Sequence, residues 1–204
     1  MTDVALTAMP AKCNTCEMLA QAPLVCVDCH QLLAHVQGAD YFELFGLPRR
    51  FDIDASELSR KYLAISRNIH PDKFASAGNE MQSFALRASA AINKAFSVLA
   101  DAHQRAEYLL ERSGGKSAAE DKRVPQDLLA RVMMFREEIE EAKASGDRAA
   151  LDAMRGDVSA QKRRLHEVIA ELCARIDGGE ASVKDELRMQ LNAVKYLDNL
   201  LAQL

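Results

Sequence analysis

The chain has 204 residues, a formal net charge of −4, and hydrophobic residues at 49% of its positions. This length accommodates one or two domains with a substantial core. The mild acidity argues against a general nucleic-acid binder, which carries a basic surplus. No apolar run reaches transmembrane length, so we expect no membrane partner.

Composition and patterning predict an all-α protein. Helix breakers are few, with 9 Gly and 5 Pro, while Ala, Leu, Glu, Lys and Arg are abundant. Four segments follow: a cysteine segment at 1–37, a compact helical unit at 38–113, a short hinge at 114–122 and a second helical unit at 123–204. The first twelve residues resemble neither a signal peptide nor a transit peptide, which predicts the bacterial cytoplasm and disfavours the mitochondrial matrix.

The N-terminal segment carries two Cys-x2-Cys pairs, Cys13 with Cys16 and Cys26 with Cys29. Each pair can turn two thiolates toward one point, and two pairs complete the tetrahedron that structural Zn²⁺ accepts. The segment is too short and polar to fold around its own core. We therefore expect one structural zinc ion to be its main stabiliser.

Other interpretations of the cysteines stay open. Iron in the same cage is chemically feasible. A second alternative is that the four cysteines bind no metal and are free or form disulfides. We consider this less favoured for two Cys-x2-Cys pairs in a reducing cytoplasm. Residues 26–30 also form a Cys-x-x-Cys-His haem-attachment pattern, but that use needs export and leaves Cys13 and Cys16 idle. The fifth cysteine, Cys173, falls on an apolar helical stripe and is expected in the core.

The segment 38–113 reads as an antiparallel helical hairpin. Asp54 is a good N-cap, and Glu57 three residues later completes the pattern of a capping box. Pro71 ends the helix that they open. The first stripe comprises Leu58, Tyr62, Ile65 and Ile69; the second comprises Met81, Phe84, Ala88, Ile92, Ala95 and Leu99. Short helices at 41–45 and 101–112 are expected to pack across the hairpin.

A His70-Pro71-Asp72 tripeptide occupies the tight loop of this hairpin. Four basic residues flank it on the helix and in the loop: Arg60, Lys61, Arg67 and Lys73. A fixed carboxylate beside cations would favour fast, salt-sensitive docking on a partner of complementary charge. The alternatives are an ordinary solvated helix face and an enzyme that uses His70, for which the sequence offers no phosphate loop, nucleophile elbow or carboxylate pair.

Residues 38–113 resemble a J-domain. The resemblance rests on residues 40–47 (DYFELFGL), 70–74 (HPDKF) and 91–99 (AINKAFSVL), in that order and spacing. It implies binding to a DnaK-class ATPase chaperone and stimulation of its ATPase, with Asp72 meeting the partner's Arg. General J-proteins carry basic residues six and seven positions before the His, where this chain has Ala64 and Leu63, which suggests a specialised chaperone partner. No Gly/Phe-rich segment follows.

The segment 123–204 predicts a small antiparallel three-helix bundle. Its first helix is expected to have Pro125 in the first turn and to end at Gly146. Asp147 is expected to cap the second helix, which ends at Gly178 and Gly179. The core stripe of the first helix comprises Leu128, Val132, Phe135, Ile139 and Ala142, and that of the last helix comprises Val183, Leu187, Gln190, Val194, Leu197 and Leu201.

Several apolar residues fall off those stripes. They are Leu129, Met133 and Met134 on the first helix and Met189, Tyr196 and Leu200 on the last. Apolar residues rimmed by charge suggest a binding surface, and Met suits adaptable contacts. The alternative is that they pack against the J-like unit.

The whole chain is similar to the HscB family, J-proteins dedicated to iron–sulfur cluster assembly. The resemblance rests on residues 70–76 (HPDKFAS), 105–110 (RAEYLL) and 135–138 (FREE), and a four-cysteine extension occurs in part of the family. It implies an HscA-type chaperone partner and a C-terminal domain that binds the IscU scaffold. By motif, the scaffold contacts fall on Leu129, Met133, Arg136, Glu137, Glu141 and Tyr196. Ala130 and Met134 depart from the family pattern.

The sequence therefore predicts a non-enzymatic co-chaperone with a zinc knuckle, a J-domain hairpin and a C-terminal three-helix bundle. Two rivals remain: a J-protein with a different client, and a zinc-ribbon protein that binds nucleic acid or regulates another protein. The latter predicts binding to DNA or RNA that weakens steeply with salt. The sequence leaves the oligomeric state open.

Overall fold

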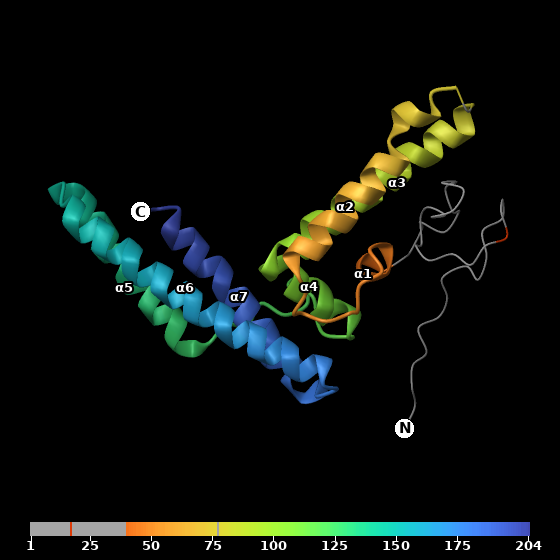
Figure 1. Ribbon diagram of the computed structural model, residues 1–204. Coiled ribbons are helices and arrows are strands. Elements are labelled where there is room, and N and C mark those ends of the chain that lie inside the picture. The colour runs from red at the N-terminus through yellow and green to blue at the C-terminus, as the bar shows by residue number, and fades with distance from the viewer. Residues whose placement is uncertain (1–16, 18–39, 77) are drawn as a thin grey trace. The chain divides into compact units, whose positions relative to one another are not determined.

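The computed structural model describes residues 17, 40–76 and 78–204 (Figure 1). This part of the chain contains seven α-helices and two 3₁₀ helices and no strand, which confirms the predicted all-α class. The four cysteines predicted to bind zinc lie outside the described residues. None of the described helices combines the length and hydropathy that a bilayer-spanning helix requires.

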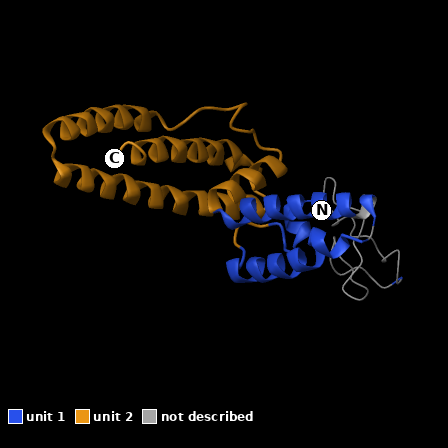
Figure 2. Ribbon diagram, turned by 90° about the horizontal axis from the view of Figure 1, so that it is seen from above, with its two compact units in different colours: residues 1–49, 53–101 blue, residues 50–52, 102–204 orange. Residues whose placement is uncertain are grey.

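The chain divides into two compact units (Figure 2). Among the described residues, the first unit comprises 17, 40–49, 53–76 and 78–101, and the second comprises 50–52 and 102–204. The division falls between Asp101 and Ala102, ahead of the hinge predicted at 114–122. Helix α4 (Ala102–Arg112) makes its contacts within the second unit.

The first unit begins with α1 (Tyr41–Leu44), which Asp40 and Glu43 close with a capping box. The Asp40 carboxylate accepts a hydrogen bond from Phe42 N (2.9 Å), and Glu43 accepts one from Asp40 N (3.2 Å). These two bonds satisfy donors that a four-residue helix leaves unpaired. They leave Phe42 and Leu44 buried in the core of this unit.

The hairpin consists of α2 (Ala55–Ile69) and α3 (Asn79–Ala100), which lie antiparallel (Figure 1). Asp54 caps α2 as predicted, but Glu57 pairs with Lys61 (3.1 Å) instead of closing a capping box. Four positions of the predicted α3 stripe are confirmed, since Ala88, Ile92, Ala95 and Leu99 are all buried. Phe84 is half-buried, and the side chain of Met81 lies outside what the structure describes. The small side chains on α3 let α1 and α2 pack closely against it.

In the second unit, α5 (Gln126–Ser145), α6 (Arg148–Asp177) and α7 (Lys184–Leu201) form the predicted three-helix bundle, and η2 (Ala181–Val183) precedes α7. Gly146 ends α5 with a left-handed φ of 69°, and Asp147 caps α6 by accepting a hydrogen bond from Ala150 N (3.0 Å). Pro125 is the N-cap of α5 and not a first-turn residue. Helix α4 packs against α6 and α7 and adds a fourth helix to the bundle.

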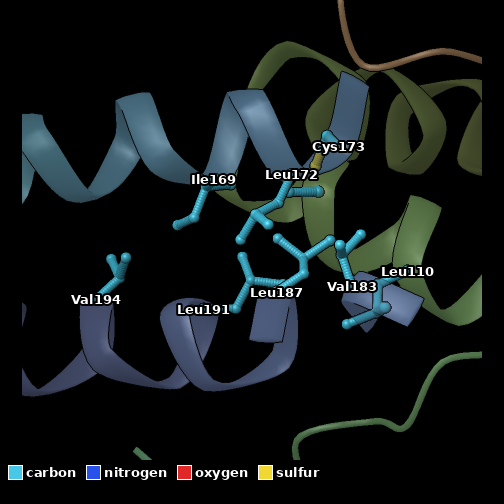
Figure 3. Packing of buried hydrophobic residues seen from close by; sticks show 9 residues of the cluster. Leu110, Ile169, Leu172, Cys173, Val183, Leu187, Leu191 and Val194 are labelled. Atoms are coloured by element: carbon cyan, nitrogen blue, oxygen red, sulfur yellow. The ribbon is translucent and has the colours of Figure 1, made fainter. Parts of the chain in front are cut away.

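Two hydrophobic clusters fill this unit. At one end, α4, α6 and α7 bury the residues drawn in Figure 3, where Ile169 and Leu172 of α6 point toward Leu187 and Leu191 of α7. At the other end, Leu128, Val132 and Ile139 of α5 pack with Leu197 and Leu200 of α7. Because α7 contributes to both clusters, its apolar arc is wider than one stripe.

Arg188 of α7 is fully buried and pairs with Glu107 of α4. Both guanidinium Nη atoms contact the carboxylate, and Arg188 Nη2 lies 2.5 Å from Glu107 Oε1. His103 (3.6 Å) and Lys195 (3.7 Å) also face this carboxylate. Burial raises the pKa of Glu107, but the hydrogen bonds and charge of Arg188, with Lys195 and His103, lower it by more, so the pKa lies below its ordinary value.

Glu107→Gln should destabilise the protein by about 3 kcal/mol at pH 7, since it leaves the buried Arg188 cation without a counter-charge. Urea unfolding of the full chain measures this loss. Glu167→Gln, which changes an exposed carboxylate on α6, should stay within about 0.5 kcal/mol of the wild type.

The same pair predicts an acid-sensitive difference. A depressed folded-state pKa stabilises the protein above the unfolded-state pKa, near 4.5, and that contribution disappears as pH falls through the folded-state value. The stability gap between wild type and Glu107→Gln should therefore shrink below about pH 4.5. A gap that stays constant into acid would contradict this assignment.

Candidate functional site

The His70-Pro71-Asp72 tripeptide lies where α2 ends and η1 (Pro71–Phe74) begins. His70 has an extended conformation, with φ −58° and ψ 129°, because the residue before a proline is excluded from the helical region. Pro71 opens η1, where its missing N–H costs nothing. The proline thus forces the sharp bend that the sequence predicted.

Two side chains of α3 hold this bend in place. Ser89 Oγ donates to Ile69 O (3.2 Å) just before the tripeptide, and Gln82 Nε2 donates to Ala75 O (2.6 Å) just after it. Both carbonyl groups sit at ends of helical segments, where no intrahelical donor reaches them. The tripeptide is therefore fixed to α3 on both sides.

Inside the bend, the side chains of His70 and Asp72 have different roles. Asp72 N donates to His70 Nδ1 (3.3 Å), and Lys73 N donates to His70 O (3.0 Å). Asp72 Oδ2 also lies 3.4 Å from Nδ1, a contact that becomes an ion pair only when the imidazole is protonated. The Asp72 side chain is 90% exposed, so its carboxylate is available to another molecule.

The predicted basic residues divide into two kinds. Arg60, Arg67 and Lys73 are exposed, and no carboxylate in the described part of the chain forms an ion pair with them. Lys61 is half-buried, pairs with Glu57 and donates to Gly46 O (2.8 Å). Of the four, Arg60, Arg67 and Lys73 are thus exposed cations, and Arg67 and Lys73 line the same pocket as His70, while Lys61 ties α2 to the end of α1.

The second candidate surface is the exposed side of α5. Leu129, Met133 and Met134 are 45%, 66% and 60% exposed, which makes them the most prominent apolar side chains of the described second unit. Their charged neighbours Arg136, Glu137 and Glu141 are exposed as well. We call Leu129, Met133, Arg136, Glu137 and Glu141 the α5 patch. The structure confirms that these residues lie outside the core.

The predictions for α7 need correction. Leu200 was expected outside the core but is fully buried in the cluster that includes Leu128 and Val132. Tyr196 is half-buried and packs against the same cluster, so only part of its ring can contact a partner. The single-stripe prediction was wrong because α7 packs against α4, α5 and α6 together.

Cys173 is the one cysteine whose surroundings the structure describes. It is 1% exposed within the cluster of Figure 3, as its position on the apolar stripe predicted. Burial raises the pKa of its thiol to about 12, and Asp177 acts in the same direction. Cys173 is therefore a neutral core residue and not a thiolate ligand.

Sequence reasoning missed the residues that position the tripeptide. Gln82 and Ser89 are single polar residues in an otherwise regular helical pattern, and neither belongs to a recognisable motif. The only signal is that Ser89 interrupts a run of alanines, at 88 and 90. Arg188 was also missed. It is buried because it pairs with Glu107 of another helix, and such a pairing leaves no local pattern in the sequence.

Comparison with known proteins relates both units to one family. A family model for the DnaJ domain matches residues 40–108, and a model for the HSCB C-terminal oligomerisation domain matches residues 124–204. A co-chaperone protein HscB homologue from Vibrio cholerae is 40% identical over 163 residues, covering 78% of this chain and 93% of the relative. This chain belongs to the HscB family of J-domain co-chaperones.

Other family members agree with this assignment. The HscB homologue of Paraburkholderia phymatum is 34% identical over 152 residues, covering 74% of this chain and 85% of its own length. The solved structure of the chaperone HscB from Vibrio cholerae matches with a TM-score of 0.68 at 32% identity, covering 80% of this chain and 94% of that one. The human co-chaperone HscB shares the fold, with a TM-score of 0.76 at 22% identity and coverage of 92% and 93%.

Proposed function

We propose that this HscB-family protein serves iron–sulfur cluster assembly in the bacterial cytoplasm. Its J-domain binds an Hsp70-class chaperone of the HscA type and stimulates that chaperone's ATPase. Its C-terminal unit delivers an IscU-type scaffold protein as the client. The chain acts through its partner's ATP hydrolysis and performs no chemistry of its own.

The observation that carries the chaperone half is the exposed Asp72 carboxylate on a bend fixed from both sides by Gln82 and Ser89. A rigid group loses little conformational entropy when a partner binds it. Arg67 and Lys73 add positive charge that attracts an acidic partner surface. A cation on the chaperone that pairs with Asp72 completes this arrangement.

Asp72→Asn should abolish stimulation of the chaperone's ATPase, because the amide keeps the shape of the side chain but removes its charge. Steady-state ATP hydrolysis by the HscA-type chaperone, with the full-length variant added, measures the effect. Scaffold binding should stay intact.

A matched control is Asp152→Asn, which neutralises an exposed carboxylate of α6 and should leave stimulation unchanged. Equal loss of stimulation and scaffold binding in Asp72→Asn would count against two separate sites.

The α5 patch supports the scaffold half of the proposal. Exposed Leu129 and Met133 can bury apolar surface against a client, and Met adapts to irregular shapes. Arg136, Glu137 and Glu141 form a charged rim that can orient the client. The exposed part of Tyr196 lies on α7, which packs against α5.

Leu129→Ala combined with Met133→Ala should weaken scaffold binding at least about tenfold, because both side chains leave the apolar centre of the patch. Calorimetric titration with the purified scaffold measures the Kd. Both residues are exposed, so thermal unfolding should be unchanged. Val168→Ala, at a half-exposed apolar position on α6, provides the control. An unchanged Kd in the double variant would reject the patch.

We further propose that Cys13, Cys16, Cys26 and Cys29 hold one structural zinc ion. Four thiolates in two Cys-x2-Cys pairs are a donor set that Zn²⁺ fits, and a reducing compartment keeps them available. The metal would fold the N-terminal segment, for which the sequence provides no hydrophobic core.

The purified protein should be colourless and contain about one zinc per chain by elemental analysis. Cys13→Ser with Cys16→Ser should lose the metal, since two oxygen atoms replace half of the thiolates. Cys173→Ala should retain it, because Cys173 is buried away from solvent. Iron in place of zinc, or a red protein with a haem absorption band, would overturn this proposal.

A further inference from the structure

A groove lies among the three helices of the C-terminal bundle, on a different side of α5 from the α5 patch. Its volume is about 400 Å³, and its lining includes Arg131 of α5 with Arg164 and Val168 of α6. All of its residues belong to the second unit. Leu129 and Met133 are each two positions from Arg131, which is about 160° around a helix, so the groove and the α5 patch are separate surfaces.

The groove combines apolar side chains with two exposed cations. Val168 is 39% exposed and is the one large hydrophobic side chain of the described second unit that is exposed outside α5. Arg131 donates to Gln161 Oε1 (3.3 Å), and no carboxylate among the residues that the structure describes forms an ion pair with Arg131 or Arg164. Asp127, one turn before Arg131, also lines the groove. The other apolar lining residues are Leu128, Leu165, Ala193 and Leu197.

Along α6, the edge of this groove continues into a line of three exposed residues. Arg164, Val168 and Glu171 follow one another at spacings of four and three positions, which places them on one side of the helix. Glu171 has no ion-pair partner in the described part of the chain, because Arg175, one turn further on, pairs with Glu180 (2.7 Å). The line thus carries a cation, an apolar side chain and an anion, in that order.

This order is complementary to itself when the helix direction is reversed. In an antiparallel pair of α6 helices related by a twofold axis beside Val168, Arg164 of each copy faces Glu171 of the other. The two Val168 side chains then meet at the axis. Because a twofold contact repeats every pairing, this short stretch of helix supplies two ion pairs around an apolar centre.

We propose that the α6 line, with the groove beside it, forms an interface between two copies of this chain. Ion pairs between Arg164 and Glu171 of opposite copies fix the antiparallel register, and Val168 supplies the apolar centre. The match of residues 124–204 to a domain described as an oligomerisation domain agrees with self-association of this unit, and it names no surface. The inference goes beyond the proposed function, since neither the His70–Asp72 bend nor the α5 patch takes part.

Such an interface should be weak and sensitive to salt. One pair of helices buries an area at the low end of protein interfaces, and ion pairs at its edge remain exposed to screening by mobile ions. We therefore expect a monomer–dimer equilibrium with a Kd on the order of 10–100 μM, which shifts toward the monomer as salt rises.

Sedimentation equilibrium of the full-length protein in reducing buffer, over about 5–500 μM, measures this association. Arg164→Glu should weaken it at least about tenfold, because carboxylates then face each other at both symmetric contacts. Glu171→Arg should weaken it by a similar factor, because it brings arginines together. An equimolar mixture of the two variants should associate at about the wild-type level, since each arginine again faces a carboxylate of the other chain.

Arg163→Glu is the matched control, because Arg163 is also exposed but lies about 100° around α6 from Arg164 and outside the groove. It should leave the association unchanged. Unchanged thermal unfolding at low concentration shows that each variant is folded.

Three results would overturn the proposal. A wild-type protein that stays monomeric throughout leaves the groove to an acidic segment of a different protein. Dimers that survive both charge reversals use another surface. A mixture of the two variants that associates no better than either variant alone shows that Arg164 and Glu171 of opposite copies do not face each other.

Discussion

Fixation of the His70–Asp72 bend to α3 is the constraint on which the proposed chaperone docking depends. Pro71 creates the bend, and the bonds from Ser89 and Gln82 hold the backbone on either side of it. The Asp72 carboxylate is then almost fully exposed to water on a backbone that is held on both sides. A partner thus meets a charge at a defined position and loses little entropy by binding it. The α2–α3 hairpin thus provides the packed scaffold that holds this polar turn in place.

The second unit exposes apolar side chains of α5 while its core is filled by residues of the other helices and of the opposite side of α5. Helix α7 packs against three helices and carries the buried Arg188, whose pairing with Glu107 ties α4 into the bundle. With the core supplied in this way, one side of α5 is free to present Leu129 and Met133 to solvent. The sites proposed for chaperone docking and client binding lie in separate compact units, so we expect that each can be altered without the other.

Local sequence patterns predicted much of this arrangement. Spacing within single helices was enough to predict the apolar stripes of α2, α3 and α5, the caps at Asp54 and Asp147 and the exposure of Met133. The misses depend on packing between helices. Leu200 is buried because α7 has three neighbours, and Arg188 is buried with its counter-charge Glu107, which lies 81 positions away in the sequence. Such contacts leave no periodic signal in the sequence, and the HscB resemblance named the family but not these pairs.

The central claim is that Asp72, at a rigid bend beside cations, binds an Hsp70-class chaperone. Its most direct test is a titration of the fluorescently labelled full-length protein with each Hsp70-class chaperone of the source cell in the ATP state. The account predicts saturable binding to at least one of them, weakened by salt and competed by unlabelled wild type but not by Asp72→Asn. No binding to any of these chaperones, or equal competition by the variant, would contradict it.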